Sequence, residues 1–482
     1  MTKETFNIDK NNNFSEWYSE IIEKAEIADL RYNVKGFVVI RPWGALILEK
    51  MYEFYEKELQ KKSHLPVFFP SVIPENNFKK ESEHVKGFTP SVFWLEKIND
   101  SEEKLALRPT SETAFYQLYS LWINSWRDLP LKLYQRANVF RLETKSTRPL
   151  IRSREFYWIE AHNAFATKKE AENQVREDVE ITENIMHKIF GVPFLPMKRP
   201  EWDKFPGAEY TIGSDTIMPD GKIIQQPSTH LLGQHFSKAF NIKFKTIEEK
   251  EEYVWQTCYG PAISRILASV ISMHGDNNGL ILPFKISPIQ VLIVPIHSEK
   301  NNENILKTAE KIKQELEKFS IETKIDFSNK RPGEKFYFWE MKGVPLRIEI
   351  GEKEIKDKKI TLFIRDIKEK IQVPISKLSR EILNQGKLID ERLLKKADQI
   401  LNYSIQKCKT KEEIKNALEN KKIAKFEFCS IETKGEKCAE YIEKELSARV
   451  MGIRADKKEV PSDKCIICDK KADVVVYAGK SY

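Results

Sequence analysis

The chain has 482 residues, of which 41% are hydrophobic and 32% charged, as in a soluble globular protein. One core rarely organises so many residues, so two or three domains are expected. The net charge of +8 is compatible with a polyanionic partner without indicating one by itself. The first residues lack the apolar core of a signal peptide, and no run approaches the roughly 18 apolar residues of a membrane span, so we expect a cytoplasmic protein.

The first part of the chain, residues 1–285, is predicted to be an α+β domain with an antiparallel sheet. Apolar residues at helical spacing predict helices over 14–30 and 43–61, with further helical stretches over 167–190 and 260–274. Between these stretches, short aromatic and β-branched segments broken by Pro and Gly indicate strands. Such an order of elements favours an antiparallel sheet with helices packed on it.

Strands alternating with helices predict a separate α/β domain over residues 286–389. The expected elements are a buried strand IQVLIVPI (289–296), an amphipathic helix over 299–318, a strand IETKIDF (321–327), a helix near 334–342, and strands LRIEI (346–350) and ITLFIRD (360–366).

The remaining residues, 390–482, are predicted to form a small α+β domain that binds zinc. Four of the six cysteines lie here, as Cys429, Cys438, Cys465 and Cys468. Two pairs of thiolates suit a tetrahedral zinc ion, and without a histidine in this region a closed structural site is expected. Free or redox-active thiols are the alternative. Because the cysteines lie far along the chain from the motifs described next, zinc removal is expected to leave those motifs' activity intact.

The stretch FRLETKSTRPLIRSREF (140–156) concentrates charge between two strand-like ends. An arginine at a strand end can hold a phosphate with its fork of donors, and a carboxylate two residues on points to the same side, so Arg141 and Glu143 are predicted to face one site. They could grip an adenylate, with Phe156 stacked on the base. A surface salt bridge would explain this pair equally well. The remaining basic residues are predicted to form a loop that reaches a second, larger anion: Lys145, Arg148 and Arg154.

The surrounding segments resemble the signature motifs of class II aminoacyl-tRNA synthetases. Pro70 in HLPVFFPSVIPE matches the proline of motif 1, Arg141 and Glu143 match the Arg-x-Glu of motif 2, and Arg265 in GPAISRILAS matches the arginine of motif 3. Over nearly the whole chain, in order, the sequence is similar to the prolyl-tRNA synthetase family in its archaeal and eukaryotic form. The segments that carry this resemblance are RPWG (41–44), LRPTSET (107–113), FYWIEAH (156–162), KFPGAEYT (204–211), STHLLGQHFSKAF (228–240), HGDNNGLILP (274–283) and PGEKFYFWEMKGVPLRIEIG (332–351).

The resemblance implies ATP-dependent activation of L-proline to prolyl-adenylate, with Mg²⁺ bridging the phosphates, followed by transfer to the 3′ end of tRNA(Pro). Arg141 and Arg265 are implied as catalytic residues: Arg141 would hold the α-phosphate and the proline carboxylate, and Arg265, with Arg152, the β- and γ-phosphates. No general base is expected, because the attacking carboxylate is already ionised and positioning carries the rate. The implied ATP-binding residues are Arg141, Glu143, Arg152, Phe156, Gln225, Ser228 and Arg265.

Proline offers a secondary ammonium and a compact apolar ring for recognition. The resemblance implies that Thr110 and Glu112 meet the ammonium, where a charged carboxylate is required. Aromatic residues would wall the ring, although each of them taken alone would be read as ordinary core. The implied proline-binding residues are Thr110, Glu112, Arg141, Trp158, His162, Phe205 and His230.

The 286–389 domain resembles the family's anticodon-binding domain. Glu340 and Arg347 are implied to contact the anticodon, because a carboxylate and an arginine fork can read the edges of unpaired guanines, and proline anticodons are rich in guanine. A surface ion pair is the alternative.

Motif 1 of class II synthetases implies a homodimer. The apolar row on the predicted helix 43–61 is suited either to that interface or to the core of one chain: Ile47, Met51, Phe54 and Tyr55. The stretch between Phe156 and Arg265 is mostly occupied by the quoted motifs, so no editing domain is expected between motifs 2 and 3.

Two other functions compete with this prediction. A synthetase of the threonyl type is expected to hold a catalytic zinc through Cys and His, and Cys258 is the only cysteine in that zone. A non-catalytic tRNA-binding paralogue could lose Arg141, Glu143 or Arg265, and all three are present.

Overall fold

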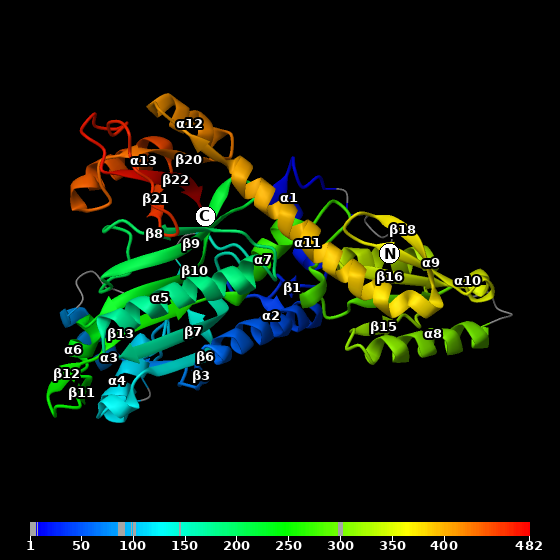
Figure 1. Ribbon diagram of the computed structural model, residues 1–482, viewed down its shortest axis with the longest axis horizontal. Helices are drawn as coiled ribbons and strands as arrows, with labels where there is room; N and C mark the ends of the chain where they lie inside the picture. Colours follow the sequence, from blue (N-terminus) through cyan, green and yellow to red (C-terminus); the bar gives the residue numbers. More distant parts are fainter. Residues whose placement is uncertain are drawn as a thin grey trace.

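The computed structural model describes residues 6, 8–84, 92–97, 99, 103–143, 146–296 and 302–482. Figure 1 shows two bodies joined by the long helix α11 (Leu378–Ser404): a large one built on a large sheet, and a smaller one formed by the yellow-green to yellow part of the chain. In the described part of the chain, none of the helices is long and apolar enough to cross a membrane.

An eleven-stranded sheet forms the large body within the described residues, in the order β19-β20-β22-β21-β8-β9-β10-β13-β7-β6-β3. The ladders from β21 through β8, β9, β10, β13 and β7 to β6 are antiparallel, which confirms the predicted sheet type. Its strands are β3 (Leu65–Pro66), β6 (Leu131–Phe140), β7 (Glu155–Phe165), β8 (Leu195–Lys198), β9 (Tyr210–Ile217), β10 (Lys222–Gly233), β13 (Trp255–Gly260), β19 (Ile405–Lys407), β20 (Ile423–Phe428), β21 (Arg449–Arg454) and β22 (Val474–Ser481).

Helices pack on this sheet and bury a common core. α1 (Phe14–Lys24), α2 (Pro42–Lys61) and α7 (Ile263–His274) contribute to one hydrophobic cluster. α5 (Lys168–Thr182) begins with a capping box, in which Thr167 and Glu170 satisfy each other's backbone amides, and a π-helical turn (Glu183–His187) continues it. The predicted helices are therefore present, although that over 14–30 ends at Lys24.

The apolar row on α2 lies inside the chain. Ile47, Met51 and Tyr55 are fully buried in this cluster, and Phe54 packs against it half-buried. Of the two uses predicted for the row, core packing is the one that the structure shows. The row therefore gives no support to a dimer interface.

The smaller body confirms the predicted α/β domain. Parallel pairing joins β15 (Thr323–Ile325), β14 (Val291–Pro295) and β16 (Leu346–Ile350), and antiparallel pairing adds β17 (Lys359–Ile364) and β18 (Glu369–Pro374). Its helices are α8 (Asn302–Glu317), α9 (Pro332–Met341) and α10 (Glu352–Asp357). Arg365 ties this domain to the large body through hydrogen bonds of 3.0 and 2.7 Å to Asp276.

The C-terminal residues extend the large sheet. Ile453 pairs with Lys198 and Arg454 with Met197, so β21 joins the catalytic strand β8 directly. α12 (Lys411–Glu419) and α13 (Glu436–Leu446) pack on this extension, and α11 runs across the predicted boundary at 389/390. The continuity of the sheet brings the C-terminal domain against the catalytic one.

The shorter elements are β1 (Ala28–Asp29), β2 (Val39–Ile40), β4 (Val72–Pro74), α3 (Glu75–His84), β5 (Leu105–Leu107), α4 (Glu112–Trp122), η1 (Trp126–Asp128), α6 (His235–Ala239), β11 (Lys243–Lys245), β12 (Glu251–Tyr253), η3 (Phe284–Ile286), η4 (Ile375–Lys377) and η5 (Thr433–Gly435).

Candidate active site

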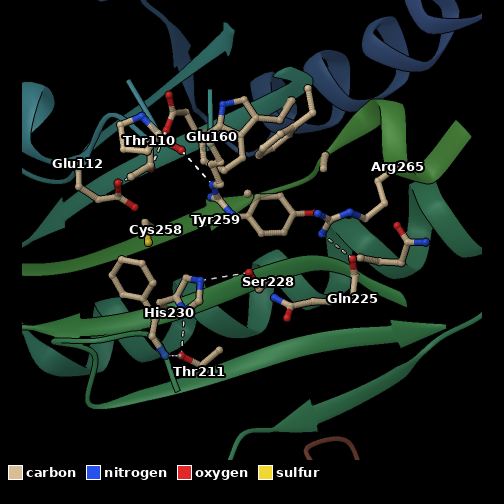
Figure 2. A pocket seen from close by; sticks show the side chains of 18 of the residues that line it. Thr110, Glu112, Glu160, Thr211, Gln225, Ser228, His230, Cys258, Tyr259 and Arg265 are labelled. Atoms are coloured by element: carbon tan, nitrogen blue, oxygen red, sulfur yellow. Dashed lines mark hydrogen bonds between the residues drawn. The ribbon is translucent and has the colours of Figure 1, made fainter. Parts of the chain in front are cut away.

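A cavity of about 600 Å³ opens on the face of the large sheet formed by β7, β10 and β13 (Figure 2). The first residues of α4, the chain after β6 and the loop after β8 supply its other walls. The structure brings every residue predicted for proline or ATP binding to this cavity: Thr110, Glu112, Arg141, Glu143, Arg152, Phe156, Trp158, His162, Phe205, Gln225, Ser228, His230 and Arg265.

Arg141, Arg152 and Arg265 lie near one another at one end of the cavity. Arg265, on the first turn of α7, donates a hydrogen bond of 3.0 Å to the backbone carbonyl of Gln225 (Figure 2). It donates a second one, of 3.2 Å, to the backbone carbonyl of Ile151. Burial lowers the pKa of Arg265 to about 10, and the charges of Arg141 and Arg152 add to this effect. A cation whose pKa is lowered by neighbouring cations is stabilised by an anion, which makes this end suited to a polyphosphate.

Glu143 and Arg152 bind each other. Arg152 donates from Nε and Nη2 to Oε2 of Glu143, at 2.9 and 2.7 Å. The two residues were predicted to contact different parts of ATP, so ligand binding would have to exchange this ion pair for two new contacts. Phe156, predicted to stack on the base, lies under the guanidinium of Arg141 at 5.1 Å and packs edge-on against Trp158.

The predicted basic loop does not form as expected. Arg148 lies among the rings of Phe14, Tyr18 and Tyr482, with its guanidinium about 5 Å from each ring centroid. Arg154 donates at 3.2 and 3.1 Å to the carbonyl of Glu143. Both arginines therefore hold the chain in place and do not face a second anion. Lys145, the third residue of this prediction, lies outside the described residues.

Carboxylates occupy the other end of the cavity. The hydroxyl of Thr110 donates to Glu112, and Glu160, on β7, accepts from the backbone amide of Ser111 at 3.1 Å and from Gln135 at 2.7 Å. Burial alone would raise the pKa of Glu160, but hydrogen bonds with His162, Ser111 and Gln135 outweigh burial and hold this pKa below its usual range. Glu160 is thus an ionised carboxylate beneath the Thr110–Glu112 segment.

Glu160 was missed by the sequence prediction, although a signal for it existed. Trp158, Glu160 and His162 alternate along β7, and alternate residues of a strand share a face. Since Trp158 and His162 were both assigned to the pocket, Glu160 between them belonged there too.

Cys258 joins the same end of the cavity from β13, where it is the cross-strand neighbour of both His162 and His230. The donor atoms of Glu112, His162 and Cys258 lie within 4.8 Å of one another and could hold a metal ion. Burial raises the pKa of the Cys258 thiol well above its ordinary value, and the nearby Glu112 carboxylate raises it further. Without a metal ion the thiol is therefore protonated.

His230 is fixed as a neutral side chain. Its Nδ1 lies 2.8 Å from the hydroxyl of Thr211, and its Nε2 lies 3.1 Å from that of Ser228 (Figure 2). Burial lowers its pKa to about 3, with Arg199 and His162 contributing. The Thr211 hydroxyl also accepts from the amide of Phe205 at 2.9 Å, and the rings of Phe205 and His230 are 4.7 Å apart. One network of hydrogen bonds therefore joins side chains of β9 and β10 to the loop that carries Phe205.

The predicted anticodon residues lie together in the smaller body. Arg347 is 4% exposed, its guanidinium stacked between Phe336 and Phe363 at 3.8 and 4.2 Å. It donates at 2.6 Å to Glu340 and at 2.9 Å to Glu349. Glu340 keeps 23% of its side chain exposed, so it is the member of the pair that a base can reach.

The four clustered cysteines meet at one point. Their sulfur atoms all lie within 4.8 Å of one another, and all four are free thiols. A tetrahedron of sulfurs about 2.3 Å from zinc has edges of about 3.8 Å, so the set fits a zinc ion. The backbone of Cys465 closes a tight turn with Lys470 and Asp469, which presents Cys465 and Cys468 to the same centre.

The cysteine centre lies close to the loop that walls the cavity, although it is far along the chain from the motifs. Ile431, two residues beyond Cys429, accepts a 2.8 Å hydrogen bond from the amide of Glu201, in the loop that carries Phe205. Distance along the chain therefore does not measure distance in space here.

Comparisons with known proteins identify the family. Residues 93–274 match the tRNA synthetase class II core domain (G, H, P, S and T), residues 290–385 an anticodon-binding domain, and residues 411–482 the C-terminal domain of prolyl-tRNA synthetase. The chain is 47% identical to a proline–tRNA ligase of Thermofilum pendens, over 100% of both chains.

Two solved structures share the fold over nearly the full length. A prolyl-tRNA synthetase of Giardia lamblia in complex with prolyl-adenylate aligns with a TM-score of 0.95 and 37% identity, covering 99% of this chain and 100% of that one. The Cryptosporidium parvum enzyme complexed with L-proline and AMP aligns with a TM-score of 0.90 and 33% identity, covering 98% and 99%. The chain therefore belongs to the prolyl-tRNA synthetase family of class II aminoacyl-tRNA synthetases, whose members are proline–tRNA ligases.

Proposed function

We propose that this chain activates L-proline with Mg-ATP to form prolyl-adenylate and then transfers the prolyl group to the 3′ end of tRNA(Pro). The observation that carries the proposal is the position of Arg141. It is half-buried in the cavity wall, and the charges that act on it are the carboxylates Glu112, Glu143 and Glu160. The charge of Arg141 also lowers the pKa of Arg265, which lies on the phosphate side of Arg141. A single cation thus lies between an acidic subsite and a basic one.

The acidic subsite suits the secondary ammonium of proline. Glu112 would pair with this ammonium, with Thr110 orienting the carboxylate and Glu160 adding a second negative charge beneath it. Trp158, Phe205, His162 and the neutral His230 would enclose the ring.

The basic subsite suits ATP. Arg141 would neutralise the α-phosphate as the proline carboxylate attacks it, while Arg152 and Arg265 hold the leaving pyrophosphate. Glu143 and Gln225 would contact the nucleotide, and Phe156 would stack on the base. Ser228, whose hydroxyl is hydrogen-bonded to His230, would contact the nucleotide at its ribose. Magnesium enters as part of the nucleotide substrate and bridges the phosphates. Because the nucleophile is already ionised, alignment across Arg141 supplies the catalysis.

Proline-dependent exchange of pyrophosphate into ATP tests this activity. We expect exchange with proline and little with threonine, followed by charging of tRNA(Pro). Pyrophosphate exchange that threonine supports better than proline would instead favour a threonyl-tRNA synthetase. Binding of tRNA without any exchange would favour a non-catalytic tRNA-binding protein. The ligands of the two solved relatives, prolyl-adenylate in one and L-proline with AMP in the other, support the proline reading.

Several finer proposals accompany this function. Glu340, oriented by Arg347, would contact the anticodon. One structural zinc would be held by Cys429, Cys438, Cys465 and Cys468. The enzyme would act in the cytoplasm. We retain domain boundaries at 285/286 and 389/390 as approximate limits. A homodimer remains proposed on family membership alone, and sedimentation at micromolar concentration tests it.

A further inference from the structure

The loop between β8 and β9, residues 199–209, walls the proline end of the cavity. Five of its residues line the cavity: Arg199, Asp203, Lys204, Phe205 and Pro206. The loop has no regular secondary structure beyond turns, and within it Glu201 and Asp203 are exposed. A segment of this kind needs contacts from elsewhere to hold one conformation.

The C-terminal domain supplies those contacts at the tip of the loop. Trp202, half-buried, packs against the hydrophobic cluster that contains Cys429, Cys438 and Cys465. Its neighbour Glu201 donates its backbone amide at 2.8 Å to the carbonyl of Ile431. The loop tip is thus anchored in the core around the four cysteines.

The base of the loop is held from the same domain. Arg199 is fully buried and donates at 2.7 Å to Asp215 on β9 and at 2.9 Å to the carbonyl of Met451 on β21. Arg449, also on β21, lies 3.7 Å from Asp203 and 3.6 Å from Asp215. Both strands that flank the loop are therefore tied to β21 through charged groups.

We infer that the C-terminal domain sets the position of Phe205, and so the affinity for proline, through the positioning residues Trp202 and Arg449. The inference rests on the proposed function, since proline is the probe. Phe205 follows Trp202 by three residues and contacts His230 and Thr211, whereas the arginines proposed for the ATP subsite, Arg141, Arg152 and Arg265, lie outside this loop. A loosened loop should therefore weaken proline binding selectively.

Steady-state pyrophosphate exchange with varied proline and varied ATP tests the inference. Trp202→Ala should raise KM for proline by about tenfold or more, because a misplaced binding wall is costly, and leave KM for ATP within about twofold. Trp202→Phe, which keeps an aromatic ring in the cluster, should restore most of the affinity. Arg449→Gln should raise KM for proline several-fold and change KM for ATP less, although the charge of Arg449 also acts on Arg265. Trp126→Ala, at an exposed aromatic in η1, is the matched control and should change neither KM.

Hydrogen exchange gives a readout that does not depend on catalysis. In Trp202→Ala, the peptide covering 199–209 should exchange faster, including the amides of Glu201 and Phe205, while the peptide covering β10 stays as in the wild type. If Trp202→Ala does not fold, as judged by thermal unfolding, then Arg449→Gln decides the question on the same measurements.

Unchanged KM for proline in folded Trp202→Ala, or in Arg449→Gln where Trp202→Ala does not fold, would overturn the inference, and so would equal rises in the KM values for proline and ATP. Absence of proline-dependent exchange in the wild type would instead overturn the proposed function. The two failures are distinguishable, because the wild type alone decides the second.

Discussion

The hydroxyl of Tyr482 donates a 2.8 Å hydrogen bond to Asp220, which lies just before β10. The ring of Tyr482 packs at 5.3 Å from the guanidinium of Arg148, and its backbone carbonyl lies 3.5 Å from Nη1 of Arg152. The last described residue of the chain therefore supports the segment that presents motif 2 to the cavity.

This contact predicts an effect on ATP binding. Tyr482→Ala removes the ring that packs on Arg148 and should loosen the segment that carries Arg152. KM for ATP should therefore rise several-fold, with KM for proline changed less, because Arg152 lies at the phosphate end. Tyr482→Phe, which keeps the ring on Arg148, is the control. Its KM for ATP should lie between those of the wild type and Tyr482→Ala. Pyrophosphate exchange at varied ATP measures the effect, and an ATP KM equal to that of the wild type in Tyr482→Ala would contradict it.

Arg141→Ala should abolish proline activation and leave the fold intact. Loss of a charged donor that acts on both subsites is expected to cost roughly 3 kcal/mol or more of transition-state stabilisation, about a hundredfold or more in rate. Pyrophosphate exchange measures the loss of proline activation, and thermal unfolding shows whether the fold is intact. Arg154→Ala, which removes a contact to the backbone of Glu143 outside the proposed ligand contacts, should retain more activity than Arg141→Ala. Near-normal exchange in Arg141→Ala would remove the assignment.

The purified protein should contain one zinc per chain, and Cys465→Ser should lose it. Elemental analysis measures the zinc content. Chelation should raise KM for proline, because Ile431 and the cysteine cluster contact Glu201 and Trp202 in the pocket loop. A metal-free native protein, or a disulfide between any two of the four cysteines, would refute the structural zinc.

Glu340→Ala should weaken charging of tRNA(Pro) without changing proline activation. The variant removes the exposed carboxylate of the Glu340–Arg347 pair, in a domain separate from the cavity. KM for tRNA should rise about tenfold, in line with loss of a base contact worth about 1–3 kcal/mol. Glu352→Ala, on the first turn of α10, serves as a comparison acidic residue. An equal loss in pyrophosphate exchange would show that Glu340 acts on the fold and not on the anticodon.

Alanine and cysteine should be activated detectably and not edited by this chain. Small side chains that fit within a proline-sized pocket are rejected by only about 1–3 kcal/mol. Between Phe156 and Arg265 the structure holds β7, α5, β8 to β13 and α7, all of them part of the catalytic body, so this stretch offers no separate hydrolytic domain. Incubation with alanyl-tRNA(Pro) tests this, and rapid hydrolysis that requires the protein would reveal an editing site.

The sequence by itself determined the fold class, the family and many of the residues that line the cavity, but not Glu160 or Cys258. Motif residues such as Arg141, Glu143 and Arg265 were predictable because local chemistry, a strand end and a helix start, fixes where each side chain points. The strand and helix assignments in 286–389 followed from periodicity for the same reason.

Only the tertiary structure decided what each charge contacts. Arg148 and Arg154 look like Arg141 in the sequence, yet burial against Tyr482 and the Glu143 backbone gives them a supporting place. The apolar row of α2 could equally have faced a partner, and its burial depends on helices and strands distant in the chain. Likewise, the approach of Ile431 to Glu201 arises from the pairing of β21 with β8, a contact between residues some 250 positions apart that no local pattern encodes.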